Sequence, residues 1–165
     1  MASKLFELPD LICLSDFGGS FDVYLDAVYK IFERDFITSK PTFKGTRLGL
    51  KRHPVTDGRA YTFYHMTHEG KDELNRTPDL RRCERIGWPR PMIDFSESSQ
   101  LKVWSNVRGR DKRILIYHQA EKYLVILDDR GDFILPWTAY LITYRHQEEK
   151  LLKEYEAYKK AEAAK

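Results

Sequence analysis

The chain has few cysteines, little charge imbalance and no long apolar run, and each of these shortages excludes a class of protein. Cys13 and Cys83 are the only cysteines and neither belongs to a CxxC pair, so the sequence predicts no disulfide framework and no zinc knuckle, and a reducing cytosol suits it. Lysine and arginine number 28 against 25 aspartates and glutamates, which gives a net charge of +3. That surplus is too small to indicate a polyanionic partner, so an argument for nucleic-acid binding depends on where the charges lie.

The apolar stretch near the N-terminus is interrupted by charged residues and proline. In MASKLFELPDLICLSDFGGS the interruptions are Glu7, Pro9, Asp10 and Asp16, too many for a signal peptide or a membrane span. We therefore expect a soluble, cytoplasmic protein without membrane contact. The 165 residues, 42% hydrophobic and 13% aromatic, fit one globular domain. We divide it into an N-terminal extension (1–19), a core (20–146) and a C-terminal helix or tail (147–165).

Hydrophobic spacing predicts the elements of the first half of the chain. Residues 20–36 carry apolar side chains at helical spacing, with Ser20 as the N-cap. Residues 47–54 and 60–67 are short runs of strand-favouring residues on either side of an Asp57-Gly58 turn, so we predict a β-hairpin. Residues 79–86 form a short predicted helix that ends at a glycine followed by two prolines.

The second half changes to the alternation that is typical of strands. Four alternating runs between residues 101 and 144 are separated by turns, which predicts a four-stranded antiparallel meander. Pro136 cannot donate to a strand ladder, so the last run either bulges there or begins its pairing afterwards. From residue 148 the sequence EEKLLKEYEAYKKAEAAK has Glu/Lys pairs at helical spacing. The expected fold class is α+β, with an N-terminal helix, an antiparallel sheet of four or more strands and a charged C-terminal helix.

The segment from Arg59 to Pro91 combines two histidines, three glutamates and six arginines with a few aromatic residues, a mixture ill suited to a core. Arginine matches phosphate oxygens, histidine transfers protons near neutral pH and glutamate can act as a base, so the segment indicates chemistry on a phosphodiester. Five of the arginines lie within residues 76–90, and Lys51, Arg52 and His53 form a second basic cluster. The alternative is a solvated loop and helix held by salt bridges, and composition does not separate the two.

The sequence HMTHE, from His65 to Glu69, resembles a zinc-protease motif only superficially. In that motif two histidines four residues apart share one helix face, whereas here the spacing is three at an expected strand end, which points the rings to opposite faces. We therefore expect no metal site. His65 and Glu69 can converge if the chain turns after Thr67, and the alternative for His65 is a half-buried histidine among aromatic neighbours.

Two hydroxyl side chains lie on the last predicted strand. Thr138 and Tyr140 are two residues apart and point to one face, which Ile134 and Ile142 share if the pleat is continuous. Hydroxyls in an apolar row need partners or solvent, and a catalytic cleft supplies both. Ordinary cross-strand contacts are the alternative. On a neighbouring strand, Arg113 either extends the basic surface or points to water.

The order of these elements carries a resemblance. A leading helix, a basic segment with histidines, an antiparallel meander and a closing strand ILPWTAY resemble the ribonuclease superfamily that groups barnase, EndoU, colicin-type tRNases and RelE toxins. The similarity covers residues 47–144. The Thr138-Ala139-Tyr140 sequence is similar to the Thr-Ala-Tyr or Thr-Ala-Phe signature of the phage and toxin branches, and residues 76–90 are similar to the RxPDLRRCERIxWPR segment of small uncharacterised bacterial proteins.

The resemblance implies cleavage of RNA without a metal or a cofactor. A base takes the proton of a ribose 2′-hydroxyl, whose oxygen attacks the adjacent phosphorus and leaves a 2′,3′-cyclic phosphate and a 5′-hydroxyl. We expect His65 to act as base or acid and Glu69 to orient or replace it. The other expected catalytic residues are Arg82 and Arg85 as phosphate clamps and Thr138 and Tyr140 as hydrogen-bond donors. Expected RNA contacts are Lys51, Arg52, Arg76, Arg81 and Arg113, with Trp88 stacking on a base.

The implied partners are an RNA, either tRNA or mRNA, and a protein that neutralises a toxin-type enzyme. Two other functions stay open. A non-catalytic RNA- or tRNA-binding module would use the same arginines and aromatic rings without requiring His65, Glu69 and Tyr140 to converge. A protein-interaction subunit of a phage-defence or toxin–antitoxin locus would use the arginine segment against an acidic partner.

Overall fold

The computed structural model describes residues 5–70 and 76–165 and confirms the α+β class. Its centre is a four-stranded antiparallel sheet in the order β5-β6-β7-β8. The strands are β5 (Leu101–Arg108), β6 (Asp111–His118), β7 (Tyr123–Asp129) and β8 (Ile134–Leu141), followed by the C-terminal helix α5 (Arg145–Ala163). Because alternating side chains and short turns favour neighbouring antiparallel strands, the predicted meander forms in full.

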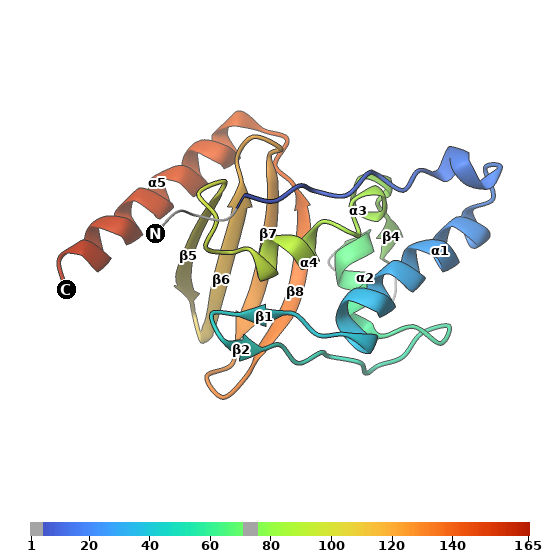
Figure 1. Ribbon diagram of the computed structural model, residues 1–165, viewed down its shortest axis with the longest axis horizontal. Coiled ribbons are helices and arrows are strands. Elements are labelled where there is room, and N and C mark those ends of the chain that lie inside the picture. Colours follow the sequence, from blue (N-terminus) through green and yellow to red (C-terminus); the bar gives the residue numbers. More distant parts are fainter. Residues whose placement is uncertain (1–4, 71–75) are drawn as a thin grey trace.

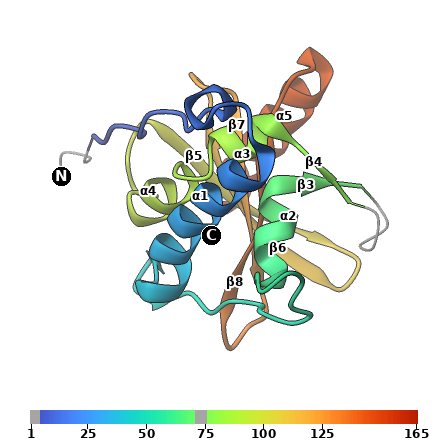
Figure 2. The ribbon, with the colours of Figure 1, turned by 90° about the vertical axis from the view of Figure 1, so that its right-hand side faces the viewer.

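The two faces of the sheet carry separate hydrophobic cores. On β7, Tyr123, Val125 and Leu127 belong to the larger core beneath the other helices, whereas Leu124 belongs to a smaller core beneath α5. This division follows from the period of two along a strand. Figure 2 shows α4 and α5 on opposite sides of the sheet, with α1 and α2 in front of β8.

A bulge in β8 changes which side chains share a face. Leu127 pairs with Pro136 and the adjacent Ile126 pairs with Thr138, so Trp137 is the extra residue. Of the two alternatives at Pro136, the strand adopts the bulge, and Pro136 itself is paired, so the pleat does not continue through this point. As a result Ile134 packs into the larger core, so the expectation that it shares a face with Thr138 was wrong.

The helices of the first half gather around the larger core. They are α1 (Phe21–Glu33), extended by a π-helical turn (Arg34–Thr38), then α2 (Tyr61–Thr67), α3 (Leu80–Glu84) and α4 (Pro89–Asp94). Figure 1 shows α1, α2 and α3 grouped beside β8. Ser20 occupies the predicted N-cap of α1, although its side chain makes no capping bond. Asp79 caps α3 by accepting hydrogen bonds from the backbone N–H groups of Arg81 and Arg82.

Residues 61–67 form a helix, so the predicted hairpin strand was wrong. The tight turn itself is present, because Thr56 and Arg59 exchange backbone hydrogen bonds around Asp57 and Gly58, which both have positive φ. The chain then enters α2, and the carbonyls of Lys51 and Arg52 accept from the first N–H groups of the helix. Six of its seven residues are buried, so the side chains have partners all round and show no alternation.

Short two-residue strand pairs and the N-terminal segment complete the fold. The pairs are β1 (Thr42–Phe43) with β2 (Thr46–Arg47) and β3 (His68–Glu69) with β4 (Thr77–Pro78), and a 3-10 helix spans Leu14–Phe17. The N-terminal segment crosses in front of the strands toward α1 (Figure 1), and the indole of Trp88 donates a 2.8 Å hydrogen bond to the carbonyl of Pro9. Residues 5–19 are therefore packed against the rest of the fold.

The helix α5 covers the second face of the sheet through Leu151, Leu152, Tyr155 and Tyr158. The carboxylate of Glu154 accepts a 2.7 Å hydrogen bond from the indole of buried Trp104. None of the helices within residues 5–70 and 76–165 combines the length and apolar character that crossing a membrane requires.

Candidate active site

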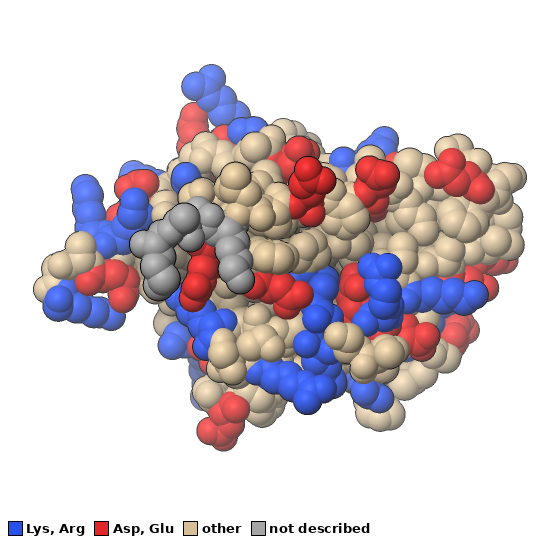
Figure 3. Space-filling model, viewed as in Figure 1, with Lys and Arg blue, Asp and Glu red and all other residues tan. Residues whose placement is uncertain are grey.

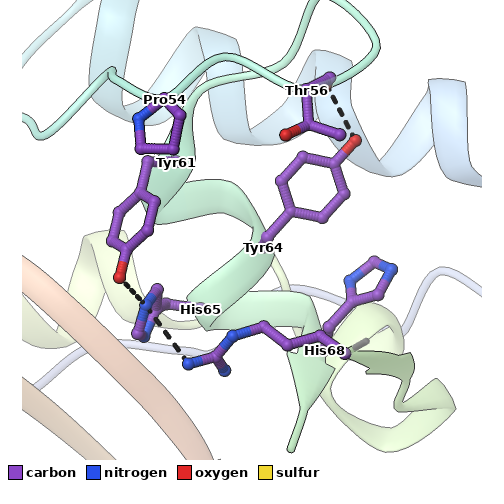
Figure 4. Close-up of a pocket in the computed structure, with 7 residues that line it drawn as sticks. Pro54, Thr56, Tyr61, Tyr64, His65 and His68 are labelled. Atoms are coloured by element: carbon purple, nitrogen blue, oxygen red, sulfur yellow. Dashed lines mark hydrogen bonds between the residues drawn. The ribbon is translucent and has the colours of Figure 1, made fainter. Parts of the chain in front are cut away.

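A pocket of about 240 Å³ lies between α2 and the loop that precedes it (Figure 4). Seven of the described residues line it: Pro54, Thr56, Tyr61, Tyr64, His65, His68 and Arg76. Tyr61, Tyr64 and His65 are spaced at i, i+3 and i+4, so α2 presents all three on one side, whereas a strand would divide them between two faces. His68 follows directly after the last residue of the helix. The helical conformation of α2 therefore creates this site.

His65 is buried at 8% exposure and makes two contacts through Nε2. The Tyr61 hydroxyl lies 2.5 Å from Nε2, and the Nη2 of Arg76 lies 3.3 Å from it. Arginine has only donors, so the second contact requires Nε2 to carry its lone pair. The imidazole also packs against the indole of Trp137, with ring centroids 4.7 Å apart. His65 is thus held as a hydrogen-bond acceptor next to a fixed positive charge.

His68 is buried at 6% exposure and its tautomer follows from its neighbours. The Thr67 hydroxyl donates to the carbonyl of Phe63 at 2.7 Å, and its oxygen lies 2.8 Å from Nδ1 of His68. The single hydroxyl proton is already used, so Nδ1 must be the donor and Nε2 the acceptor. Burial, together with the charges of Arg59, Arg76 and Arg82, lowers the pKa of His68 from 6.5 to about 4. The ring is therefore neutral at pH 7.

Positive charge surrounds this pocket, and none of its seven lining residues is acidic. The ammonium of Lys51 lies 4.1 Å from the centre of the Tyr61 ring, and Arg76 forms part of the wall. Elsewhere the signs are mixed: the face in Figure 3 has Lys and Arg interspersed with Asp and Glu. An anion is therefore favoured at the pocket by local charges rather than by the small net charge of the protein.

Arg82 connects α3 to α2 and β8 rather than to this pocket. Its Nη1 donates to the carbonyls of His65 and His68 at 3.2 and 3.1 Å and to the hydroxyl of Thr138 at 3.3 Å. The Thr138 hydroxyl donates to the His65 carbonyl at 2.9 Å, and the guanidinium lies over the Tyr140 ring. Arg82 and Thr138 therefore hold the end of α2, and with it His65, against the sheet.

The other arginines of residues 81–90 are paired within the fold. Arg81 and Arg85 bind Glu84 at 2.7 and 3.4 Å, and Arg90 binds Asp94 at 2.7 Å and donates to the Asp35 carbonyl. These contacts match the salt-bridged alternative for the segment. Arg76 is the member that reaches the pocket.

The remaining expected site residues lie in several places. Glu69 is exposed on β3, and Arg52 is exposed at the start of the loop before α2. Trp88 is 6% exposed and packs edge-on against Tyr123, so its ring is part of the core. Thr138, Tyr140 and Arg113 line a second pocket, on the α5 side of the sheet.

The sequence interpretation assigned His65 and Arg76 roles but gave none to Tyr61, Tyr64 or His68. The signal that could have found the two tyrosines is their helical spacing with His65 on α2, which the prediction of a strand overlooked. Within residues 5–70 and 76–165 no group of three or more His, Cys, Asp or Glu side chains is arranged to hold a metal ion.

Comparisons with known proteins found no matching family model, no similar curated protein and no matching solved structure. The site is therefore interpreted from its own geometry and from the resemblance of its sequence pattern.

Proposed function

We propose that this chain is an endoribonuclease that cleaves RNA in the α2 pocket. The observation that carries the proposal is the contact between Nε2 of His65 and the guanidinium of Arg76, in a pocket whose described lining residues include no acidic side chain. A phosphodiester is an anion, and its cleavage needs a proton acceptor next to a fixed cation. The resemblance to the barnase, EndoU, colicin and RelE superfamily supports the same reaction.

Arg76 and His65 exchange partners when the substrate binds. A phosphate oxygen takes the Arg76 guanidinium from the imidazole, because a charged acceptor bonds more strongly than a neutral one. Once the Tyr61 O–H has also turned from Nε2 toward the 5′-oxygen, the lone pair on Nε2 of His65 is available for the ribose 2′-hydroxyl proton. The 2′-oxygen attacks phosphorus, and Arg76 stabilises the added negative charge. The products are a 2′,3′-cyclic phosphate and a 5′-hydroxyl.

Tyr61 and His68 have different parts in this proposal. The Tyr61 hydroxyl, 2.5 Å from Nε2, gives its proton to the departing 5′-oxygen and recovers one from the protonated imidazole. His68 remains neutral at pH 7 and presents Nε2 as an acceptor, so it binds a ribose hydroxyl or a base edge without taking its proton. Thr138 positions α2 by donating to the His65 carbonyl. Tyr140 lines the neighbouring pocket together with Trp137, and there it contacts the RNA.

The finer assignments follow from the resemblance alone. They are tRNA or mRNA as the target, action in the cytoplasm, toxicity to the cell and a protein partner that neutralises the enzyme. Growth arrest on induction, relieved by His65→Gln, is the expected sign of toxicity.

Purified protein incubated with tRNA and mRNA in EDTA, with the ends of the products mapped, tests the proposal. We expect 2′,3′-cyclic phosphate ends from the wild type and at least a ~100-fold slower rate from His65→Gln, because a positioned acid or base contributes about that much. His146→Gln, which changes an exposed histidine on α5, is the matched control and should keep the wild-type rate. If the wild type binds these RNAs but leaves them whole, the chain is a binding module and the proposed catalysis is wrong.

A further inference from the structure

A second pocket, of about 270 Å³, lies between the sheet and α5. Ten residues line it, and those that matter to its chemistry are Asn106, Arg108, Arg113, Trp137, Tyr140 and Leu151. They combine aromatic and aliphatic side chains with two arginines and one amide. Pockets of this kind suit a ligand that is flat and largely apolar but carries polar edges and a negative charge.

The two arginines of this pocket are held differently. Arg113 is 18% exposed, pairs with buried Asp128 at 2.7 Å and lies 4.6 Å from the centre of the Trp137 ring. Arg108 is 60% exposed and pairs with Glu154 at 3.2 Å. An exposed ion pair contributes little free energy, so Arg108 can exchange the carboxylate for a phosphate at small cost. Arg113 is therefore held in place as part of the pocket wall, whereas Arg108 can change its partner and bind a phosphate.

Asn106 supplies a hydrogen-bond acceptor of defined orientation. Its Nδ2 donates to Glu154 at 2.8 Å, and because a carboxylate only accepts, the amide cannot be turned the other way. Its Oδ1 is buried and has no hydrogen-bond partner among the described residues. A buried acceptor left unpaired costs free energy, so a ligand that donates to Oδ1 gains affinity. Adenine, cytosine and guanine carry an exocyclic amino group that projects from the ring, whereas the only N–H donor of uracil in a nucleotide is N3–H, within the ring.

Trp137 joins the wall of this pocket to His65, a lining residue of the proposed active site. The indole of Trp137 contacts the His65 imidazole and also the Arg113 guanidinium, at 4.7 and 4.6 Å between centres.

We propose that the second pocket binds a nucleotide that flanks the cleaved phosphodiester, and that it prefers a base with an exocyclic amino group. The base lies among the aromatic and aliphatic side chains and donates to Oδ1 of Asn106. The phosphate beyond it binds Arg108. This inference rests on the proposed function, because the α2 pocket holds the phosphodiester next to that nucleotide.

Fluorescence anisotropy with uncleavable 2′-O-methyl oligonucleotides tests the inference. The probes are the dinucleotide UU and the tetranucleotides UUUU and AUUA, which place a uracil or an amino-bearing base on either side. We expect wild-type protein to bind AUUA about tenfold more tightly than UUUU, in line with one hydrogen bond to a buried group. Asn106→Leu should bind the two equally, with its folding checked by thermal unfolding.

Arg108→Ala provides a second and independent measurement, because that side chain is exposed and its loss leaves the core intact. It should weaken binding of both tetranucleotides, lower the slope of log affinity against log salt by about 0.7, and leave UU unchanged. Arg110→Ala, in the turn of the same hairpin, is the matched control and should resemble the wild type.

Equal wild-type affinity for AUUA and UUUU, or a preference that survives in Asn106→Leu, would overturn the inference. If RNA is cleaved while neither variant alters tetranucleotide binding, the flanking pocket is wrong and the ribonuclease proposal stands. If both variants behave as expected but no RNA is cleaved, the pocket binds RNA and the proposed catalysis is wrong.

Discussion

The low pKa of His68 makes a quantitative prediction about stability. Burial of the ring, and then the charges of Arg59, Arg76 and Arg82, lower its pKa to about 4 from the ordinary value of 6.5. Between these values the unfolded chain binds a proton that the folded protein does not. The contribution of His68 to the free energy of unfolding is therefore fully present above pH 6.5 and is lost as the pH falls from 6.5 to 4. Below pH 4 this group causes no further loss. At pH 4 the loss amounts to about 3 kcal/mol.

The variant that tests this value is His68→Asn, because the asparagine amide can still donate to the Thr67 hydroxyl while the titrating ring is gone. Urea unfolding, followed by tryptophan fluorescence, would be measured for both proteins at intervals from pH 7 to pH 4. The carboxylates that titrate in this range are common to both proteins and cancel in the difference between their free energies of unfolding. We expect that difference to shift by about 3 kcal/mol in favour of the variant. A difference that stays constant with pH would refute the assignment of His68 as a buried neutral base.

Two further predictions concern the side chains that join the elements. Arg82→Ala should lower the free energy of unfolding by about 3 kcal/mol, because it leaves the His68 carbonyl and the Thr138 hydroxyl without this donor and removes one of two donors to the His65 carbonyl. Arg81→Ala, at a side chain that is 67% exposed, should change the free energy of unfolding by less than about 1 kcal/mol. Equal effects in urea unfolding would show that Arg82 does not hold α2. Glu154→Ala should lower the free energy of unfolding by about 2 kcal/mol and increase proteolysis within α5, because the Trp104 indole loses its acceptor. An unchanged rate of proteolysis would show that Glu154 does not hold α5 against the sheet.

The predictions about the sheet succeeded because local patterns determine a meander. Alternation along residues 101–144 separates the two cores, and the short turns leave neighbouring strands only one economical way to pair. The helix α3 was equally predictable, since Asp79 caps it by bonds to residues two and three positions later. Pro136 has no backbone N–H, which indicated either a bulge or a later start of pairing in the last strand. Only the pairing of β8 with β7 showed that a bulge forms and that Trp137 is the extra residue.

The sequence by itself thus determined the α+β class, the meander and a concentration of proton-transferring and phosphate-binding residues between positions 59 and 91. Tertiary structure alone decided that residues 61–67 are helical, because burial on nearly every side removes the alternation that distinguishes a strand from a helix. Tertiary structure also decided which arginines can contact a ligand in the α2 pocket. Arg81, Arg82, Arg85 and Arg90 find carboxylates or carbonyls within the fold, while Arg76 reaches His65. The arginine side chain is the same in both roles, so the sequence does not distinguish them. Only the neighbours in space show whether an arginine holds the fold together or can bind a phosphate.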